Sequence, residues 1–364
     1  MTAAGNESLV EFVTDLLSSY KTAFVGVDFV ESLIILIGNA MIMLSVMLFQ
    51  PRKEMLIIAG LAFSDFVYGV GSLAHSVQTV RLTYLGLLHT VKISAWECML
   101  YVQTIFFIIG KQSIGLMLMV VSVDRFLAVT FLTRYSALGR RYALTILGAV
   151  MTHNLASTIV AFASSYWLTS PGRVLHAKCI SYQAVPSFYG DYAEFVAAAG
   201  GYGSVLLYVA VIWSYRRMVR QNQLSGQART NQLQRQKRLT ITLGIVTSCT
   251  LACSSIPYTI ILLMNNGTIP VRPADKPAAL SWIFSLIRVN SMVNVFIYFW
   301  RQKEMRAAIL ALLTCQRASL RASDSTMDKT RKSGRQTNGH QTQNQAPNNR
   351  LFIITPAHPV QKAE

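Results

Sequence analysis

Charged side chains are scarce in this sequence. Asp, Glu, Lys and Arg make up 13% of its 364 residues, whereas 52% are hydrophobic. Soluble domains carry about twice that share of charge, so the composition excludes an ordinary water-soluble globule. Acidic residues are the scarcer sign, 16 against 33 Lys and Arg, and none occurs from Phe195 to Ala274. The basic excess would suggest nucleic-acid binding in a soluble protein, but here it sorts by side of a membrane, and we expect no nucleic-acid partner.

Signals of catalysis and of secretion are missing too. The apolar stretches contain no zinc-ligand spacing, phosphate-binding loop or nucleophile–base pair. We therefore expect no enzyme activity, no cofactor and no metal site. Residues 1–20 contain Glu7, Glu11 and Asp15 but no basic residue and no sustained apolar run. We expect no cleavable signal peptide here, and the first apolar stretch should direct insertion itself.

Seven apolar stretches of 20 or more residues dominate what is present. Each is long enough to cross the roughly 30 Å hydrocarbon layer of a bilayer. They are predicted at residues 24–49, 55–80, 97–124, 141–167, 190–215, 238–264 and 278–300. The predicted fold class is all-α, an integral membrane bundle of seven transmembrane helices over residues 24–300.

The distribution of positive charge predicts the orientation. With the N-terminus outside, 24 of the 33 Lys and Arg residues fall in cytoplasmic segments, 7 fall in outer segments, and Lys111 and Arg288 lie within spans. The positive-inside rule therefore makes residues 1–23 extracellular and the C-terminus cytoplasmic, in a multi-pass plasma-membrane protein. Glycosylation sequons at Asn6 and Asn266 lie outside in this orientation.

The chain changes character after the seventh span. In residues 301–315, Met305, Ile309 and Leu312 share one face and basic residues the other, which predicts an amphipathic helix on the lipids of the inner leaflet. Cys315 is a candidate for palmitoylation, and an inert free thiol is the alternative. Residues 316–364 are polar with almost nothing to bury, so we expect a disordered cytoplasmic tail.

The third span ends in the charged pair Asp124-Arg125, followed by Phe126. A charged pair at a helix end indicates by itself only a membrane boundary. With its neighbours in residues 121–129, however, it resembles the Asp-Arg-Tyr box of the rhodopsin-like G-protein-coupled receptors, with Phe126 in place of the tyrosine. The resemblance implies that Asp124 holds Arg125 at rest, and that activation releases Arg125 to couple to a heterotrimeric G protein.

Further motifs extend the resemblance over about residues 24–310. They are Asn39 in the first span, Asp65 in the second, Pro257 in the sixth, and Asn290, Ser291, Asn294 and Tyr298 in the seventh. An ionisable residue in mid-membrane needs partners, so Asp65 should face the bundle interior. Asn290, Asn294 and Tyr298 recur every four residues and share one helix face. We expect this face to meet Asp65 and Asn39 in a water-bearing polar core, and the resemblance implies that the sixth helix swings about Pro257 on activation.

The departures from the family pattern are as informative. Val295 stands where the family usually has proline, so the kink that proline gives the seventh helix should be weaker or come from elsewhere. Ser255 and Leu251 replace the tryptophan and phenylalanine usual near Pro257. These departures indicate a divergent member, which looks more like the large invertebrate chemoreceptor groups, the nematode type included, than like a vertebrate hormone receptor.

The resemblance also implies a disulfide between Cys98 and Cys179. Both cysteines lie outside in the predicted orientation, where the surroundings are oxidising. The spacing from Cys98 to Arg125 is slightly longer than is usual in the family. This indicates a bulge or a shifted start of the third helix.

The ligand chemistry depends on the outer half of the bundle. Phe107 stands where amine-binding members carry an aspartate, which disfavours an amine ligand held by a salt bridge. Lys111 and Arg288 place two positive charges in mid-membrane, where each needs a partner. One interpretation is a pocket for a carboxylate or other anionic ligand. The other is an internal ion pair, with Glu31 as a candidate partner of Arg288.

Together these features predict a G-protein-coupled receptor with a chemosensory role. It would bind an extracellular ligand and activate a heterotrimeric G protein. A peptide or lipid receptor of the same fold is the close alternative. A seven-span transporter or channel is more distant, because the sequence contains neither an internal repeat nor matched discontinuous helices.

Overall fold

The computed structural model describes most of the chain. The described residues are 3–49, 52–87, 90–169, 174–179, 181–221, 240–272, 276–301 and 303–314. The chain divides into two units, Met1–Leu312 and Leu313–Glu364. Of the second unit only Leu313 and Thr314 are described, so the predictions for Cys315 and residues 316–364 lie outside the described residues.

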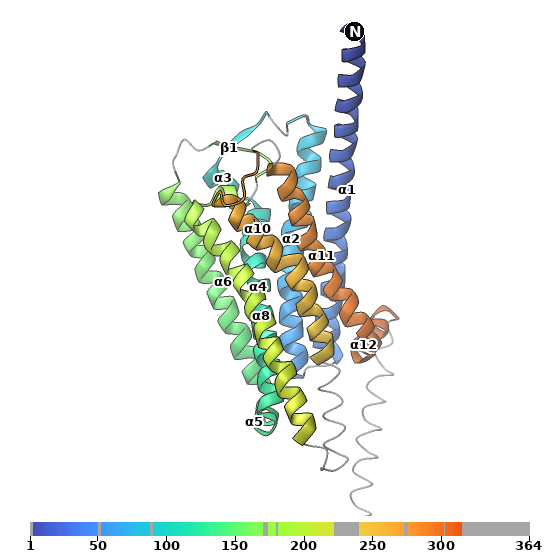
Figure 1. Ribbon diagram of the computed structural model, residues 1–364, viewed down its shortest axis with the longest axis vertical. Helices are drawn as coiled ribbons and strands as arrows, with labels where there is room; N and C mark the ends of the chain where they lie inside the picture. The colour runs from blue at the N-terminus through green and yellow to red at the C-terminus, as the bar shows by residue number, and fades with distance from the viewer. Residues whose placement is uncertain are drawn as a thin grey trace, which may run out of the picture. The chain divides into compact units, whose positions relative to one another are not determined.

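Seven helices in the described residues are long and apolar enough to cross a membrane (Figure 1). They are α1 (Ala3–Phe49), α2 (Lys53–Tyr84), α4 (Val102–Thr130), α6 (Arg140–Leu168), α8 (Ser187–Gln221), the segment Thr240–Asn265 and α11 (Lys276–Arg301). The all-α class and the seven spans are confirmed. Six of the predicted spans agree within a few residues with the membrane-spanning parts of these helices, which are Val25–Leu48 in α1 and Ser187–Arg217 in α8. α4 packs most extensively against α2 and α8.

The third crossing helix begins later than predicted. The sequence predicted residues 97–124, whereas α4 begins at Val102, because the chain first forms the short helix α3 (Ala95–Met99). Ser94 starts α3 with a capping box: its hydroxyl accepts the Glu97 N–H at 3.1 Å, and the Glu97 carboxylate accepts the Ser94 N–H at 2.7 Å. These bonds also lower the pKa of Glu97. The separate helix α3 explains the long spacing from Cys98 to Arg125.

A two-stranded antiparallel sheet closes one end of the bundle. It pairs β1 (Lys92–Ser94) with β2 (Val174–His176), with Ile93 opposite Leu175. The short helix α7 (Ser181–Ala184) follows β2. We call this end of the bundle the sheet end. The opposite end carries α5 (Leu132–Ala137), and we call it the α5 end (Figure 1).

The sixth crossing segment changes its helical register at Pro257. Leu251–Ser255 form the π-helical turn η1, and α10 (Ile256–Asn265) follows. Proline has no N–H to donate to the carbonyl one turn earlier, and its ring displaces that carbonyl. A π turn is one of the recognised responses to such a gap. Leu251 and Ser255, two of the positions that depart from the family pattern, lie in this turn.

The seventh helix has no such break. α11 runs continuously from Lys276 to Arg301, in agreement with the weaker kink predicted from Val295. A Cβ atom placed on Gly38 of α1 would lie 2.6 Å from a Val295 methyl group. Gly38 therefore makes room for the side chain that replaces proline.

After the seventh span, α12 (Lys303–Leu313) forms where the sequence predicted an amphipathic helix. Met305 and Ile309 are buried in the main hydrophobic core, whereas Leu310 and Leu313 are exposed. The buried side chains follow the spacing of a single helix face.

Candidate functional site

At the α5 end, Asp124 and Arg125 form a buried ion pair on α4. The Arg125 Nε donates to the Asp124 Oδ2 at 3.0 Å, and the Arg125 Nη2 contacts the same oxygen. Both side chains are about as buried as the hydrophobic core, with exposed fractions of 1% and 2%. Phe126 follows, partly buried. A buried pair of this kind is costly to break from one side, because the remaining charge is left without a partner.

Tyr135 of α5 is a second partner of this pair. Its hydroxyl donates to the Asp124 Oδ1 at 3.0 Å and accepts from the Arg125 Nη2 at 3.3 Å. The chain reaches this position because α4 ends at Thr130, and Phe131 turns it into α5. Burial raises the pKa of Tyr135, so the hydroxyl keeps the proton that it donates. Sequence reasoning gave Tyr135 no role, although a tyrosine soon after the charged pair was a usable signal.

Lys53, at the start of α2, joins α2 to α5. Its ammonium donates to the carbonyl oxygen of Leu138 at 2.8 Å and to that of Tyr135. It also lies 3.7 Å from the centroid of the Tyr135 ring, a cation–π geometry. One face of the tyrosine is thus held by Lys53 while the hydroxyl holds the ion pair. The sequence offered no signal for this contact beyond a basic residue at a helix start.

The polar core is only partly assembled as predicted. Asp65 is 1% exposed, and it accepts from the Ser291 hydroxyl at 2.6 Å and from the Asn294 amide at 3.1 Å. The Asn39 amide instead donates to the Ile35 carbonyl in its own helix, at 2.9 Å. Asn290 and Tyr298 are buried, but the Asn290 Oδ1 and the Tyr298 hydroxyl have no hydrogen-bond partner among the described residues. Pro257 is also buried, on α10.

The predicted disulfide is confirmed at the sheet end. Cys98 of α3 and Cys179, after β2, are bonded, with their Cα atoms 5.5 Å apart. Both are fully enclosed in a second hydrophobic cluster that includes Tyr189 of α8. The bridge joins the start of the third crossing segment to the loop between the fourth and the fifth.

The two mid-bundle cations both have carboxylate partners. The Lys111 Nζ lies 2.6 Å from the Glu194 Oε1 of α8, and Glu194 is 1% exposed. The Arg288 Nε lies 2.8 Å from the Glu31 Oε2, and its Nη2 pairs with Asp28. The internal pair of Glu31 with Arg288 is therefore present. Sequence reasoning missed Glu194, which as an acid within the fifth predicted span carried the signal.

Aromatic and loop residues surround these pairs. The Phe107 ring lies 5.3 Å from Tyr68 and 6.0 Å from His75, centroid to centroid. Lys178, beside the disulfide, interacts electrostatically with Asp28 and Arg288, and burial lowers the pKa of Lys178. Phe107 thus packs against aromatic side chains of α2, whereas Lys111 and Arg288 are each held by carboxylates. Of the two sequons, Asn266 is exposed at the end of α10, and the side chain of Asn6 lies outside the described residues.

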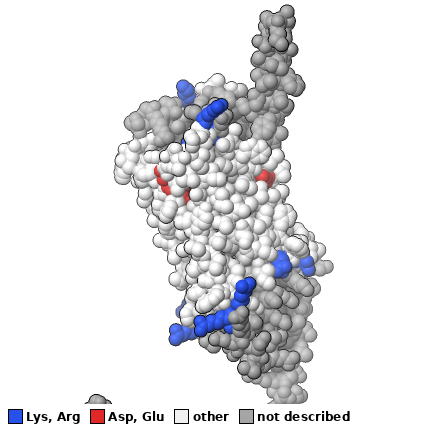
Figure 2. Space-filling model, in the orientation of Figure 1, with Lys and Arg blue, Asp and Glu red and all other residues white. Residues whose placement is uncertain are grey.

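Charge is sorted along the bundle in the way a membrane protein requires. On the face shown in Figure 2, Lys and Arg gather at the two ends, most of them at the α5 end, and leave an uncharged band broken by few acidic atoms. Within the described residues, no group of three or more His, Cys, Asp or Glu is arranged to hold a metal ion.

The comparison with protein families decides the classification. The family described as 7 transmembrane receptor (rhodopsin family) matches residues 38–298, most of the bundle. The chain belongs to this family. The family is a class of receptors and not of enzymes, and its seven crossing helices make the chain a multi-pass membrane protein.

Curated relatives match a smaller part of the chain. Sphingosine 1-phosphate receptor 2 of Rattus norvegicus and that of Mus musculus are each 33% identical to it over 81 residues. This match spans 22% of the chain and 21% of each relative. The chain is thus similar to these receptors over about a fifth of their length.

Proposed function

We propose that this receptor binds an extracellular ligand and activates a heterotrimeric G protein from the α5 end. The observation that carries the proposal is the buried Asp124–Arg125 pair, held by Tyr135 at that end. In the proposed cycle the ligand favours a packing in which Arg125 leaves Asp124 and, together with Phe126, contacts the G protein. A ligand can shift the balance only if it binds that packing more tightly than the resting one.

The proposed orientation puts residues 1–23 outside and the C-terminus in the cytoplasm of the plasma membrane. Its support is the excess of Lys and Arg in the segments at the α5 end. In this arrangement Asn6 and Asn266 are glycosylation sites. Residues 301–315 lie on inner-leaflet lipids, with Cys315 available for palmitoylation, and residues 316–364 form a tail.

The activation switch is proposed to run through the middle of the bundle. Asp65 accepts hydrogen bonds from Ser291 and Asn294, so α2 and α11 are joined at one point that a shift of α11 would break. The π turn before Pro257 gives the sixth segment a place to bend. Three buried residues of the motif, Asn39, Asn290 and Tyr298, complete this switch in the proposal.

The ligand is proposed to act on the charge pairs near Phe107. Lys111 and Arg288 are already paired with internal carboxylates, so an anionic ligand must displace Glu194 from Lys111, or Asp28 and Glu31 from Arg288. That exchange loosens α8 from α4, or α1 from α11, and so links binding to helix movement. An anionic ligand therefore fits as a competitor for internal partners and not as an occupant of free cations.

The receptor is proposed to be chemosensory. The basis is the departure of the sequence from the family pattern around Pro257 and at Val295. One observation favours a second candidate, a lipid receptor. The relatives named above are receptors for sphingosine 1-phosphate, and a lipid with a phosphate head would supply the anionic group that the exchange requires.

Replacement of Arg125 tests the coupling role. We expect Arg125→Ala to lower G-protein activation at least roughly tenfold at matched surface density, because no other group in Asp124–Phe126 can donate a fork of hydrogen bonds to a partner. Nucleotide exchange on the G protein is the measurement, and Arg81→Ala, the same change at the sheet end, is the control. Normal exchange by a well-expressed Arg125→Ala receptor would refute the proposal.

A further inference from the structure

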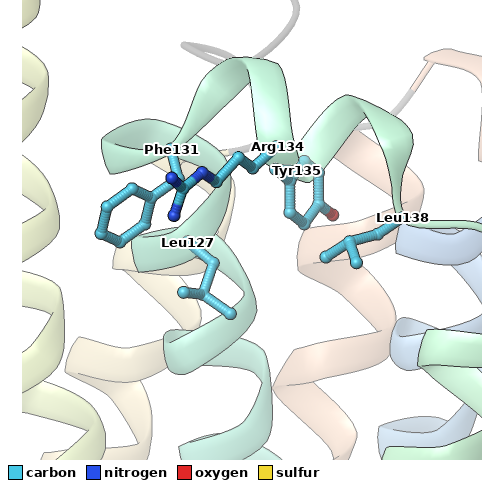
Figure 3. A pocket seen from close by; sticks show the side chains of 5 residues that line it. All are labelled: Leu127, Phe131, Arg134, Tyr135 and Leu138. Atoms are coloured by element: carbon cyan, nitrogen blue, oxygen red, sulfur yellow. The ribbon is translucent and has the colours of Figure 1, made fainter.

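A pocket of about 180 Å³ lies beside the coupling site at the α5 end. Its walls are Leu127 of α4, Phe131 and Leu138 at the two ends of α5, and Arg134 and Tyr135 within α5. Figure 3 shows the Arg134 guanidinium beside the Phe131 ring on one side of the space, with Tyr135 and Leu138 on the other and Leu127 between them. Three of the five walls are purely apolar.

The two polar side chains that line the pocket differ in whether they already have interaction partners. Tyr135 is committed to Asp124 and Arg125 through its hydroxyl, and Lys53 covers its ring. Arg134 is exposed and has no hydrogen bond or ion-pair partner among the described residues. The pocket therefore offers an apolar interior and a single available positive charge at its rim.

Water is a poor occupant of such a space. A buried water typically needs two to four polar partners, and apolar Leu127, Phe131 and Leu138 supply none. The pocket also opens at the end of a membrane-crossing helix, where acyl chains and headgroups meet. Further exposed arginines, Arg140 and Arg141, begin α6 close by in sequence. Basic clusters at the cytoplasmic boundary attract anionic lipids, because the inner leaflet carries negative charge.

We propose that this pocket binds one anionic phospholipid of the inner leaflet, with part of an acyl chain between Leu127, Phe131 and Leu138 and the headgroup phosphate or carboxylate on Arg134. The proposal rests on the orientation given under the proposed function. Tyr135 is both a wall of the pocket and a partner of the Asp124–Arg125 pair. The bound lipid therefore contacts the residue whose hydroxyl is hydrogen-bonded to Arg125.

The test is binding of phosphatidylserine and phosphatidylcholine to the purified full-length receptor, measured by native mass spectrometry without a G protein. We expect phosphatidylserine to bind more tightly. Arg134→Gln should weaken its binding about fivefold, the value of one basic residue near an anionic surface, and should leave phosphatidylcholine unaffected. Arg81→Gln, the same charge change at the sheet end, should have no effect. Glycerophosphoserine, which has no acyl chains, should not compete.

A second variant tests the apolar part of the site. Leu138→Trp fills the pocket and should weaken binding of both lipids, whereas Leu144→Trp adds the same bulk to an exposed position of α6 and should not. If Leu138→Trp lowers the yield of folded receptor, Phe131→Gln removes an apolar wall instead, with the same expected loss.

Two results would overturn the lipid site. The first is equal weakening by Arg134→Gln and Arg81→Gln, and the second is normal lipid binding after the pocket is filled. If the filled variant that binds lipid normally also loses coupling in a separate nucleotide-exchange assay, the pocket belongs to the protein partner. Because the assay contains no G protein and both faces of the receptor are accessible, its failure is distinct from a failure of Arg125 to couple.

Discussion

Single residues decide how Arg125 is held in this structure. The stretch from Phe195 to Ala274 contains no Asp or Glu, so neither the sixth helix nor the loop before it can supply an acidic partner. The structure shows where the restraint comes from instead. Asp124 is the anion, and the Tyr135 hydroxyl bridges Asp124 and Arg125. Lys53 in turn holds the segment that carries Tyr135.

We predict that Tyr135→Phe raises ligand-free G-protein activation. Hydrogen bonds to charged groups contribute about 1.5–3 kcal/mol, and about 1.4 kcal/mol is a factor of ten in an equilibrium. The ratio of active to resting receptor should therefore rise by about tenfold or more, as measured by basal nucleotide exchange against receptor density. Tyr142→Phe is the matched control, because its hydroxyl has no partner among the described residues. Equal basal activity in both variants would count against the bridge.

The Glu31–Arg288 pair carries a second prediction at this scale. Arg288→Gln leaves Glu31 and Asp28 without their cation, and breaking one side of a buried pair costs about 3–5 kcal/mol. We expect a clear loss of thermal stability in detergent, and recovery of much of it in the double variant Glu31→Gln with Arg288→Gln. Losses that simply add in the double variant would show that the two side chains do not act as a pair.

At the scale of elements, a local feature of the sequence decides whether a crossing helix is interrupted. Pro257 follows a π turn in the sixth segment, whereas Val295 leaves α11 unbroken. The consequence for packing is visible on α1, where Gly38 lies against the Val295 methyl groups. The close approach of α1 to Val295 thus depends on the absence of a side chain at Gly38.

We predict that Gly38→Ala destabilises the receptor although alanine is the better helix former. The new Cβ would lie 2.6 Å from Val295, and overpacking of this kind costs about 1–3 kcal/mol. A lower melting temperature of the purified receptor should report it, and Val295→Ala should restore it. Gly148→Ala is the control: nothing lies within 4 Å of its added Cβ, so it should be neutral or stabilising. A tolerated Gly38→Ala would mean that α1 and α11 can move apart freely.

For the whole molecule, the sorting of charge carries more information than its sum. A net charge of +17 says little by itself, but its concentration in the segments at the α5 end predicts that this end faces the cytoplasm. The proposed G-protein site and the proposed lipid site both depend on this end facing the cytoplasm.

The orientation has a direct test. An epitope tag before Met1 should be labelled by antibody on intact cells, whereas a tag after Glu364 should be labelled only after permeabilisation. The physical reason is the membrane potential and inner-leaflet charge that retain Lys and Arg on the cytoplasmic side. Labelling of the C-terminal tag on intact cells would reverse the assignment of both sites.

The sequence by itself determined the fold class, the seven spans and the family. Crossing a bilayer requires about 20 consecutive apolar residues whose backbone groups are satisfied within one helix, so the signal is local and readable in one dimension. The motifs on single helices were readable for the same reason: Asp124 precedes Arg125 directly, and Pro257 acts on its own helix. The Cys98–Cys179 bridge also followed, through the family resemblance.

Only the tertiary structure decided which side chains meet. Lys111 pairs with Glu194, 83 residues away, and Asp65 takes Ser291 and Asn294 while Asn39 bonds within α1. Such choices depend on how far each helix is rotated about its axis, and hydropathy constrains that rotation weakly in a bundle where lipid and core are both apolar. The place of Tyr135 over the Asp124–Arg125 pair depends further on one turn at Phe131, whose backbone angles no periodicity encodes.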